Sequence, residues 1–195
     1  MADKITDLSK EEIAKLYPVE LYPYNSKWQD VYHEEEMLIL GAIGNKILRI
    51  EHFGSTAIGN IVAKDTIDIL IAISPEDYSS NEIIEKLKAI QYDLTLQKEG
   101  ETQHMVLLKG YNTTGEKAQT FHIHMGPANH IIWDRIYFRD YLRKYVEVRE
   151  QYENLKKNLS ITYKSDRVGY RVAKGEFVNR ITEEAKNYYQ VKSNR

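Results

Sequence analysis

Two stretches decide the fold: Arg49-Ile50-Glu51-His52-Phe53-Gly54-Ser55-Thr56, and the apolar run Ile67-Asp68-Ile69-Leu70-Ile71, whose Asp68 follows Thr56 by twelve residues. The first predicts a strand that ends in a Gly-Ser turn, and the second predicts a strand that carries an acidic residue. A Gly-Ser turn offers backbone N–H groups and a hydroxyl to an anion. A carboxylate on the next strand can hold the divalent cation that accompanies nucleotide phosphates. Together the two stretches indicate nucleotide chemistry.

Composition and charge exclude several classes of protein. The chain has 195 residues, of which 42% are apolar and 29% charged, as in an ordinary globular protein rather than a disordered one. Its 27 Lys and Arg nearly balance 29 Asp and Glu, so no excess of positive charge indicates nonspecific binding to nucleic acid. The absence of cysteine excludes disulfides, thiolate metal sites and cysteine nucleophiles.

The start of the chain and the length of its apolar runs bear on location. Met1-Ala2-Asp3-Lys4 lacks the basic and then apolar segments of a secretory signal. The longest apolar runs are far shorter than the roughly 20 residues that a membrane span needs. We therefore expect a cytoplasmic protein with no membrane partner.

Hydrophobic periodicity predicts a sheet with helices between its strands. Ser9 and Glu12 form a candidate capping box for a short helix that ends before Pro18. Further helices are expected from Ser26 to about Ile39 and over 80–90, and strands over 47–53, 66–73, 92–97, 102–109 and 119–125. From about Asn129 onward the pattern is helical. Such a chain belongs to the α/β or α+β class.

We expect one domain that spans residues 1–195. No internal repeat, low-complexity tract or polar linker marks a second domain. Within it, residues 1–18 carry the N-terminal helix and residues 129–190 form a helical C-terminal part.

Five short motifs, in their order and spacing, resemble the GrpB family over roughly residues 19–181. They are Glu51-His52-Phe53-Gly54-Ser55-Thr56-Ala57, Ala63-Lys64, Ile67-Asp68-Ile69, His122-Ile123-His124 and Phe138-Arg139-Asp140-Tyr141-Leu142-Arg143. The resemblance implies an α+β, nucleotidyltransferase-like fold: a mixed sheet flanked by helices, with a helical C-terminal third. That architecture is related to DNA polymerase beta and the aminoglycoside nucleotidyltransferases. The resemblance implies no particular reaction, because the activity of the family is poorly defined.

The sequence departs from an active nucleotidyltransferase at the paired carboxylates. Such enzymes carry Asp-x-Asp on one strand, usually with a third carboxylate on another, to bind two divalent ions. Two residues of one strand share a face only when they lie two apart, and the partner position of Asp68 is held by Thr66. Asp65 would face the other side. Asp68 is therefore the candidate catalytic residue, without a second carboxylate beside it.

His122 and His124 form the second constellation, because alternate residues of a strand share a face. If their strand lies beside the strand of Asp68, the three side chains form a ligand set for a divalent metal, either Mg²⁺ or a transition metal. Two alternatives stay open. The imidazoles could donate to phosphate, or they could pack at a sheet edge and hydrogen-bond to their neighbours.

The candidate phosphate ligands are Gly54, Ser55 and Thr56 in the turn, Lys64 in the following loop and, on resemblance, Arg139. Lys64 could equally be a solvated loop residue. Arg139 belongs to a basic row at every fourth residue, and such a row is usually a solvated helix face.

Three further residues are expected to support the site. Glu51 could pair with Lys or Arg across the sheet, and His52 would orient the Gly-Ser turn. Lys174 resembles a residue of the family's closing helix that reaches back towards the site.

Two functions follow from these patterns. The protein binds a nucleotide or another phosphate-bearing small molecule and transfers a nucleotidyl group with the help of a metal, or it is a non-catalytic ligand-binding or interaction module that has lost the second carboxylate. A third hypothesis is that the turn is a generic nest for another anionic small molecule.

Overall fold

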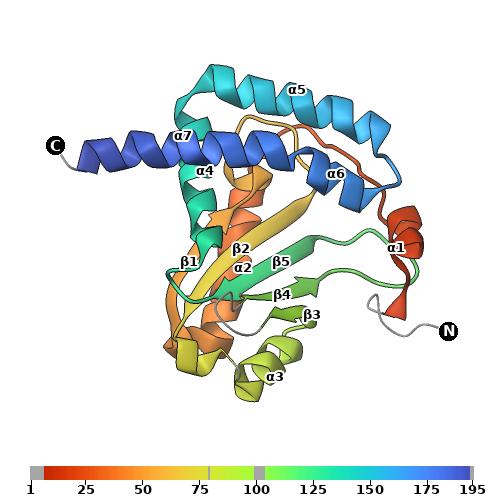
Figure 1. Cartoon of the computed structure of the whole chain (residues 1–195). Coiled ribbons are helices and arrows are strands. Elements are labelled where there is room, and N and C mark those ends of the chain that lie inside the picture. The colour runs from red at the N-terminus through yellow and green to blue at the C-terminus, as the bar shows by residue number, and fades with distance from the viewer. Residues whose placement is uncertain (1–6, 79, 99–103, 194–195) are drawn as a thin grey trace.

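Figure 1 shows the computed structural model of the chain, a mixed sheet with helices on both faces. The structure describes residues 7–78, 80–98 and 104–193. The strands are β1 (Ile47–Phe53), β2 (Thr66–Ile73), β3 (Asp93–Lys98), β4 (His104–Lys109) and β5 (Thr120–Gly126). The helices are α1 (Lys10–Leu16), α2 (Lys27–Ile43), α3 (Asn81–Ala89), α4 (Asp134–Lys144), α5 (Val146–Thr162), α6 (Arg167–Ala173) and α7 (Gly175–Ser193).

The described strands form one sheet in the order β1-β2-β5-β4-β3. β2 and β5 run parallel, and the other neighbouring pairs are antiparallel. A parallel pair needs a crossover connection, which α3, β3 and β4 supply here. The expected α+β class with a mixed sheet is confirmed.

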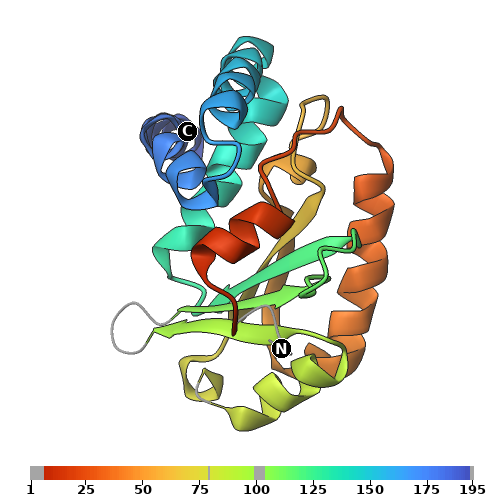
Figure 2. The ribbon, with the colours of Figure 1, turned by 90° about the vertical axis from the view of Figure 1, so that its right-hand side faces the viewer.

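The two faces of the sheet pack against different helices (Figure 2). In β2, Ile67, Ile69, Ile71 and Ile73 belong to the large core shared with α2 and α3. The alternate residues Leu70 and Ala72 pack instead against the segment that leads into α4. The period of two in a strand thus assigns Asp68 to the face covered by the C-terminal helices.

Most element boundaries agree with the sequence pattern. The capping box at Ser9 and Glu12 is present, and β1 and β2 have the expected bounds. The expectation that α2 ends near Ile39 is wrong, because the helix runs on through Gly41 to the buried Ile43. Burial of Ile43 in the core outweighs the low helix propensity of glycine. The expected strand over 102–109 begins at 104 in the structure, and 102 and 103 lie outside the described residues.

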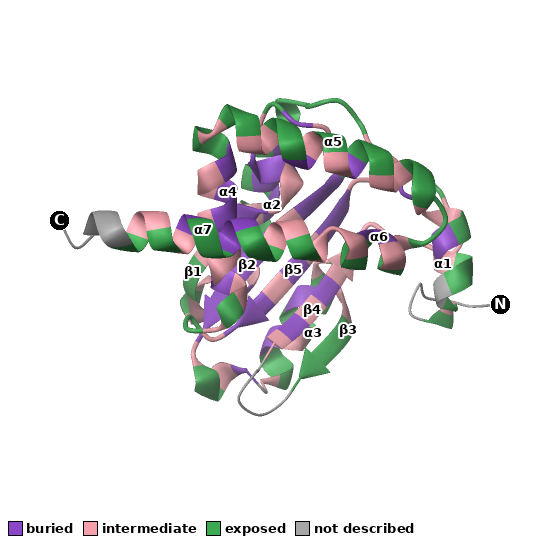
Figure 3. Cartoon of the chain, turned by 45° about the horizontal axis from the view of Figure 1, so that its top comes forward, coloured by how far each residue is buried: buried purple, intermediate pink, exposed green. Residues whose placement is uncertain are grey.

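The C-terminal helices form their own packed layer. Phe138 and Leu142 of α4, Tyr152 of α5 and Ile181 of α7 bury one another against the loop that follows the Gly-Ser turn. Figure 3 shows buried central strands beneath helices whose outer faces are exposed. No helix in the described part of the chain is both long enough and apolar enough to cross a membrane.

Candidate metal and phosphate site

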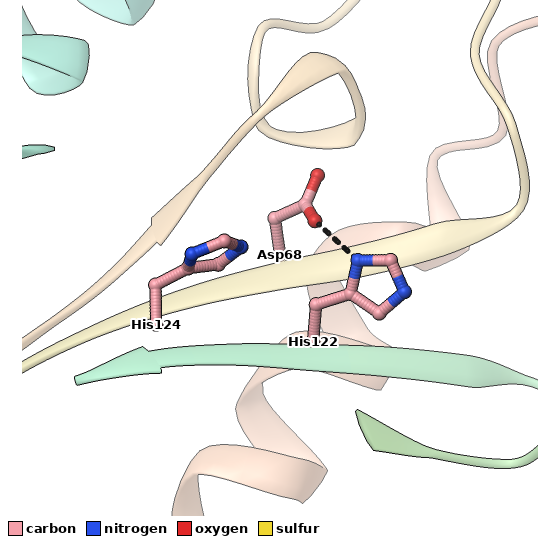
Figure 4. Close-up of side chains that lie close together, drawn as sticks. All are labelled: Asp68, His122 and His124. Atoms are coloured by element: carbon pink, nitrogen blue, oxygen red, sulfur yellow. Dashed lines mark ion pairs between the residues drawn. The ribbon is translucent and has the colours of Figure 1, made fainter. Parts of the chain in front are cut away.

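Asp68, His122 and His124 point toward one another on the face of the sheet that the C-terminal helices cover (Figure 4). Each offers one ligand atom, and these three atoms lie within 4.8 Å of one another. Oδ1 of Asp68 lies 3.2 Å from Nδ1 of His122. The side chains of Asp68 and His122 are 26% and 18% exposed, so the site is shielded but open to a small ligand. One carboxylate and two imidazoles are a ligand set for a divalent transition metal.

Strand register creates this cluster. The parallel pairing sets Asp68 opposite His122, and it sets Leu70 opposite His124. Because side chains alternate across each strand, Asp68 and both histidines emerge on the same face. The sequence could predict the shared face of the two histidines, but only the pairing of β2 with β5 brings Asp68 to them.

The outer ring nitrogens of both histidines are occupied by protein groups. Nε2 of His122 lies 2.7 Å from the Tyr111 hydroxyl, and Nδ1 of His124 lies 3.2 Å from Nε2 of His104. The inner nitrogens, Nδ1 of His122 and Nε2 of His124, therefore remain for a metal. A hydrogen-bond partner on the ring nitrogen that does not bind the metal fixes the orientation and tautomer of a metal-binding imidazole.

The three groups are held in the protonation states that bind metals. Burial lowers the pKa of His124 to about 3, and burial also lowers the pKa of His122 despite its contact with Asp68. Burial alone would raise the pKa of Asp68, but the hydrogen bond that its carboxylate accepts from His122 brings the pKa below its ordinary value. Neutral imidazoles beside an ionised carboxylate are what metal ligation requires.

The Gly-Ser turn lies directly against Asp68. Gly54 has φ +74°, and a Cβ added to it would stand 2.2 Å from Oδ2 of Asp68. A side chain at position 54 is therefore excluded by both conformation and space. Ser55 begins a short 3₁₀ turn, Ser55–Ala57, that follows β1. The turn expected to bind phosphate is thus adjacent to the metal-ligand cluster.

Hydroxyl groups occupy the place of the missing second carboxylate. Oγ1 of Thr66 lies 2.8 Å from Oγ1 of Thr120, which donates at 3.0 Å to the backbone oxygen of Asp65. The hydroxyl of Thr56 donates to the backbone oxygen of Thr66 at 3.1 Å. The Asp65 carboxylate points elsewhere and accepts from Nε1 of Trp28 at 2.7 Å. Asp68 is therefore not joined by a second acid from its own strand.

His52 holds the Gly-Ser turn in place through its contact with Thr56. It is buried, stacks on Tyr32 with ring centroids 4.7 Å apart, and places Nε2 3.0 Å from Oγ1 of Thr56. Because the Thr56 hydroxyl gives its only proton to Thr66, Nε2 of His52 is the donor in this contact. Burial lowers the pKa of His52 to about 3. These contacts are those of a residue that orients the turn, not of one that binds a metal or a phosphate.

Lys64 is a partly buried cation with no hydrogen-bond or ion-pair partner for its side chain among the described residues. It lines a pocket together with Tyr111, Thr120 and Arg167. Burial, followed by the charges of Arg167 and Lys174, lowers its pKa to about 7. This environment differs from that of a solvated loop lysine.

The structure assigns other contacts to the two arginines of the fifth motif. Nη1 of Arg139 lies 2.8 Å from Glu51 and 2.7 Å from the backbone oxygen of His52, and its Nε lies 2.7 Å from Asp140. Nε and Nη2 of Arg143 donate to the backbone oxygen of Ala57. Both guanidinium groups fasten α4 to β1 and to the Gly-Ser turn, and these contacts account for them without a phosphate.

The other members of the predicted sets lie further apart. Arg135, which begins the basic row that Arg139 and Arg143 continue at every fourth residue, donates to Thr182 and Asn179 of α7. Nζ of Lys174 lies 4.6 Å above the ring of Tyr170. The electrostatic influence of Lys174 on Lys64 shows that it nevertheless lies near the pocket.

Sequence reasoning missed Tyr111, His104 and Arg167. Tyr111 follows Gly110, whose φ of +85° turns the chain from β4 towards β5. Arg167 reaches back from α6 to donate to the Tyr111 hydroxyl at 3.3 Å and to the backbone oxygen of Tyr17 at 2.8 Å. No local pattern could reveal these contacts, because each joins segments that are distant in sequence.

Comparison with solved structures places this geometry in a known fold. GrpB from Enterococcus faecalis superposes with a TM-score of 0.75 at 26% identity, covering 87% of this chain and 99% of that one. A structure of the Cid1 poly(U) polymerase superposes with a TM-score of 0.50 at 14% identity, covering 77% of this chain and 45% of that one. The second likeness shows the fold alone.

Sequence comparison identifies the family. UPF0157 protein YqkA of Bacillus subtilis is 32% identical over 186 residues, which are 92% of this chain and 51% of that protein. Glutamate-rich protein GrpB of Alkalihalophilus pseudofirmus is 33% identical over 167 residues, 84% of this chain and 94% of that protein. The chain thus spans about half the length of YqkA. The family model described as GrpB protein matches residues 18–184, and the chain belongs to the GrpB family.

Proposed function

We propose that this protein binds one divalent transition-metal ion through Asp68, His122 and His124, and that the ion holds a phosphate group of a nucleotide or similar small molecule against the Gly54 turn. The observation that carries the proposal is the convergence of the three ligand atoms to within 4.8 Å. Besides the metal, the backbone N–H groups of the adjacent turn and the Ser55 hydroxyl would bind the phosphate.

The chemistry of the ligands favours a transition metal over Mg²⁺. Two imidazole nitrogens suit Zn²⁺ or Co²⁺, whereas Mn²⁺ and Mg²⁺ prefer oxygen ligands and Mg²⁺ retains several waters. Three protein ligands leave a coordination position open, as in catalytic rather than structural metal sites. Through that position an ion would polarise a bound phosphoryl oxygen.

The fold supports a nucleotide as the ligand. The Cid1 structure named above was solved with magnesium and 3′-dATP bound. In this chain the lone carboxylate and the two histidines occupy the sheet at the centre of the same fold. Nucleotide binding is therefore the function that the site supports best.

Nucleotidyl transfer is the stronger form of this proposal, and a non-catalytic binding module is its alternative. The hydroxyl network at Thr66 and Thr120 favours the alternative, because it leaves no second carboxylate on β2 for a second ion. One ion with a preformed phosphate turn still supports binding. The enzyme and the non-catalytic module would bind the same ligand, but only the enzyme would convert it to product.

Metal titration tests the shared part of the proposal. Isothermal titration of the full chain with Co²⁺, Zn²⁺, Mn²⁺ and Mg²⁺ should give one tight equivalent for the first two and weak binding of Mg²⁺. His122→Ala, His124→Ala and Asp68→Asn should each abolish the tight equivalent. His33→Ala, which removes an exposed histidine of α2, is the matched control and should bind as the wild type does. Equal binding by all variants would overturn the metal site.

Turnover separates the two forms. With Co²⁺ or Mn²⁺ present, the protein is incubated with each ribonucleoside triphosphate and a mixture of small hydroxylated acceptors, and release of pyrophosphate is measured. Product that disappears in Asp68→Ala supports transfer. Nucleotide binding by the wild type without any product supports the non-catalytic module.

A further inference from the structure

We infer that Lys64, together with Arg167 and Arg171 of helix α6 and Lys174 at the C-terminal end of that helix, forms a binding site for a polyphosphate, meaning two or more linked phosphate groups of a small molecule. The inference rests on the proposed function and deepens it, because it names the class of ligand: a nucleoside di- or triphosphate or a similar compound, rather than a monophosphate. The site extends from the metal ligands towards α6.

Helix geometry gathers three of these cations. Arg167, Arg171 and Lys174 are spaced by four and by three residues, so they lie on one face of α6 and its C-terminal end. Figure 2 shows α6 on the same side of the sheet as α4 and α7, which is the side that carries the metal ligands. Arg167 spans from α6 to Tyr111, whose hydroxyl contacts His122.

Lys64 completes the cluster from the loop before β2. It lines the same pocket as Arg167, along with Thr66, Tyr111 and Thr120. It also lies within electrostatic reach of Arg171, Lys174 and Asp68. The four cations therefore surround one region beside the metal ligands, although they come from two segments about a hundred residues apart in sequence.

The charge of this cluster is not balanced by protein carboxylates. Lys64 and Arg171 make no ion pair among the described residues, and Arg167 donates to two neutral oxygens. Lys174 rests on the ring of Tyr170. Asp68 is the one acid among the charges that act most strongly on Lys64. Glu20 and Asp65 also line the pocket, but Glu20 pairs with Lys117 and Asp65 accepts from Nε1 of Trp28. The four cations therefore form a positive region that these carboxylates do not neutralise.

The protein loses stability by keeping Lys64 in this position. Its pKa falls to about 7 because burial and the neighbouring cations disfavour its charged form. An anion with several charges would reverse both effects by pairing with the cations and replacing the water they lost. A single phosphate group is already provided for by the metal and the Gly54 turn, so the cations of α6 remain for further phosphates.

The test uses the full chain in EDTA, so that no metal contributes. Phosphate, pyrophosphate and tripolyphosphate are titrated by calorimetry at low ionic strength, and affinity should rise along this series. Lys64→Gln and Arg171→Gln should each weaken tripolyphosphate by about 10- to 100-fold, the worth of a charge-assisted hydrogen bond. Lys88→Gln, on α3 at the opposite face of the sheet, is the matched control and should leave the affinity unchanged.

A second variant separates a ligand-binding lysine from a structural one. Lys64→Met keeps the apolar stem and removes the unpaired charge, so the ligand-free protein should melt at the same temperature or higher, while the upward shift with tripolyphosphate is lost. A lower melting temperature of the ligand-free variant together with an unchanged tripolyphosphate shift would contradict the inference.

The outcomes distinguish this site from the metal site. Tripolyphosphate that binds no tighter than phosphate, or that binds equally to the Lys64 and Arg171 variants, overturns the polyphosphate site whatever the Co²⁺ titration shows. Loss of Co²⁺ binding only in the Asp68 and histidine variants, with tripolyphosphate binding lost only in the Lys64 and Arg171 variants, supports both. Failure of Co²⁺ to bind the wild type overturns the metal site alone.

Discussion

The hydroxyl oxygen of Tyr111 lies 2.7 Å from Nε2 of His122, while Nδ1 of the same ring lies 3.2 Å from Asp68. Without a metal, a neutral His122 donates from Nδ1 to Asp68 and accepts the Tyr111 proton at Nε2. A metal on Nδ1 requires the ring proton to be on Nε2, where the Tyr111 oxygen becomes the acceptor. A phenol hydroxyl can donate or accept a hydrogen bond, so Tyr111 can pair with Nε2 of His122 both with and without a metal.

Tyr111→Phe should therefore weaken the metal site without removing a ligand. Removing the group that hydrogen-bonds to the other ring nitrogen of a metal-binding histidine typically lowers metal affinity about 10- to 100-fold. Co²⁺ titration measures the affinity, and the visible absorption of bound Co²⁺ reports whether the ligand geometry persists. Tyr24→Phe, which removes the hydroxyl of an exposed tyrosine, serves as the control. Co²⁺ affinity equal to that of the wild type would mean that Tyr111 does not position His122.

Gly54→Ala should damage the site by two mechanisms, strain and collision. Gly54 has φ +74° and ψ −170°, a conformation that is essentially restricted to glycine and costs another residue about 1–3 kcal/mol. The new Cβ would also meet the Asp68 carboxylate at 2.2 Å. Urea unfolding should show a loss well above 2 kcal/mol, and Co²⁺ binding should fall with it. Gly59→Ala is the matched control, because Gly59 has φ +84° but nothing lies within 4 Å of an added Cβ. It should show the strain alone and retain Co²⁺. Equal effects of the two variants would contradict the close approach of Gly54 to Asp68.

Arg139→Gln should act on stability rather than on phosphate binding. The Arg139 side chain is 10% exposed and holds Glu51, Asp140 and the backbone oxygen of His52 together. Its removal leaves Glu51 with Arg49 alone, leaves Asp140 with Arg143 alone and takes a donor from the His52 oxygen. Losing these charge-assisted hydrogen bonds should cost about 1.5–3 kcal/mol. Urea unfolding measures the loss, with Arg180→Gln in the exposed pair with Glu184 as a control expected to cost at most about 1 kcal/mol. Unchanged stability with weaker phosphate binding would instead support Arg139 as a phosphate ligand, the role that the family resemblance suggests.

Local patterns predicted the elements of the fold because most strands and helices here carry a clear periodicity. β2 alternates between two buried faces, and its β-branched residues gave correct bounds at Thr66 and Ile73. The end of α2 at Ile43 was not predictable from the glycine at position 41, because tertiary burial decided it. Pairing of β2 with β5 follows from topology, which no single window of sequence contains.

The candidate site likewise contains some residues that a local motif reveals and others that only the fold brings together. Asp68 and the Gly-Ser turn are neighbours in sequence, and both are visible as a motif. Tyr111 and Arg167 carry no signal, because their importance arises from the contact of Tyr111 with His122 and from the pocket that both residues line with Lys64. Whether a basic residue faces a ligand or a carboxylate depends on packing, which spacing alone does not report.

His52 predicts a dependence of stability on acid pH. Burial lowers its pKa from 6.5 to about 3 in the folded state, so between these values the unfolded chain binds one more proton at this position than the folded chain. The stability that His52 contributes is present above pH 6.5 and is lost as the pH falls towards 3, by at most about 1.4 kcal/mol per pH unit. Urea unfolding of the wild type and of His52→Gln, measured from pH 7 to 4, should give curves that converge as the pH falls. Parallel curves would show that His52 is protonated alike in both states.

Thr66→Asp tests whether the missing carboxylate limits the site to one ion. Residues 66 and 68 share a face of β2, so the new carboxylate would project beside Asp68 and near Lys64. Burial of the new charge should cost stability, with Lys64 offsetting part of that cost. Titration with Mn²⁺ should give one equivalent for the wild type and a second, weaker equivalent for Thr66→Asp. Thr66→Asn is the control, because it has nearly the same shape but no charge, and it should bind one equivalent. A single equivalent in all three proteins would show that the second ion is excluded by something other than the residue at position 66.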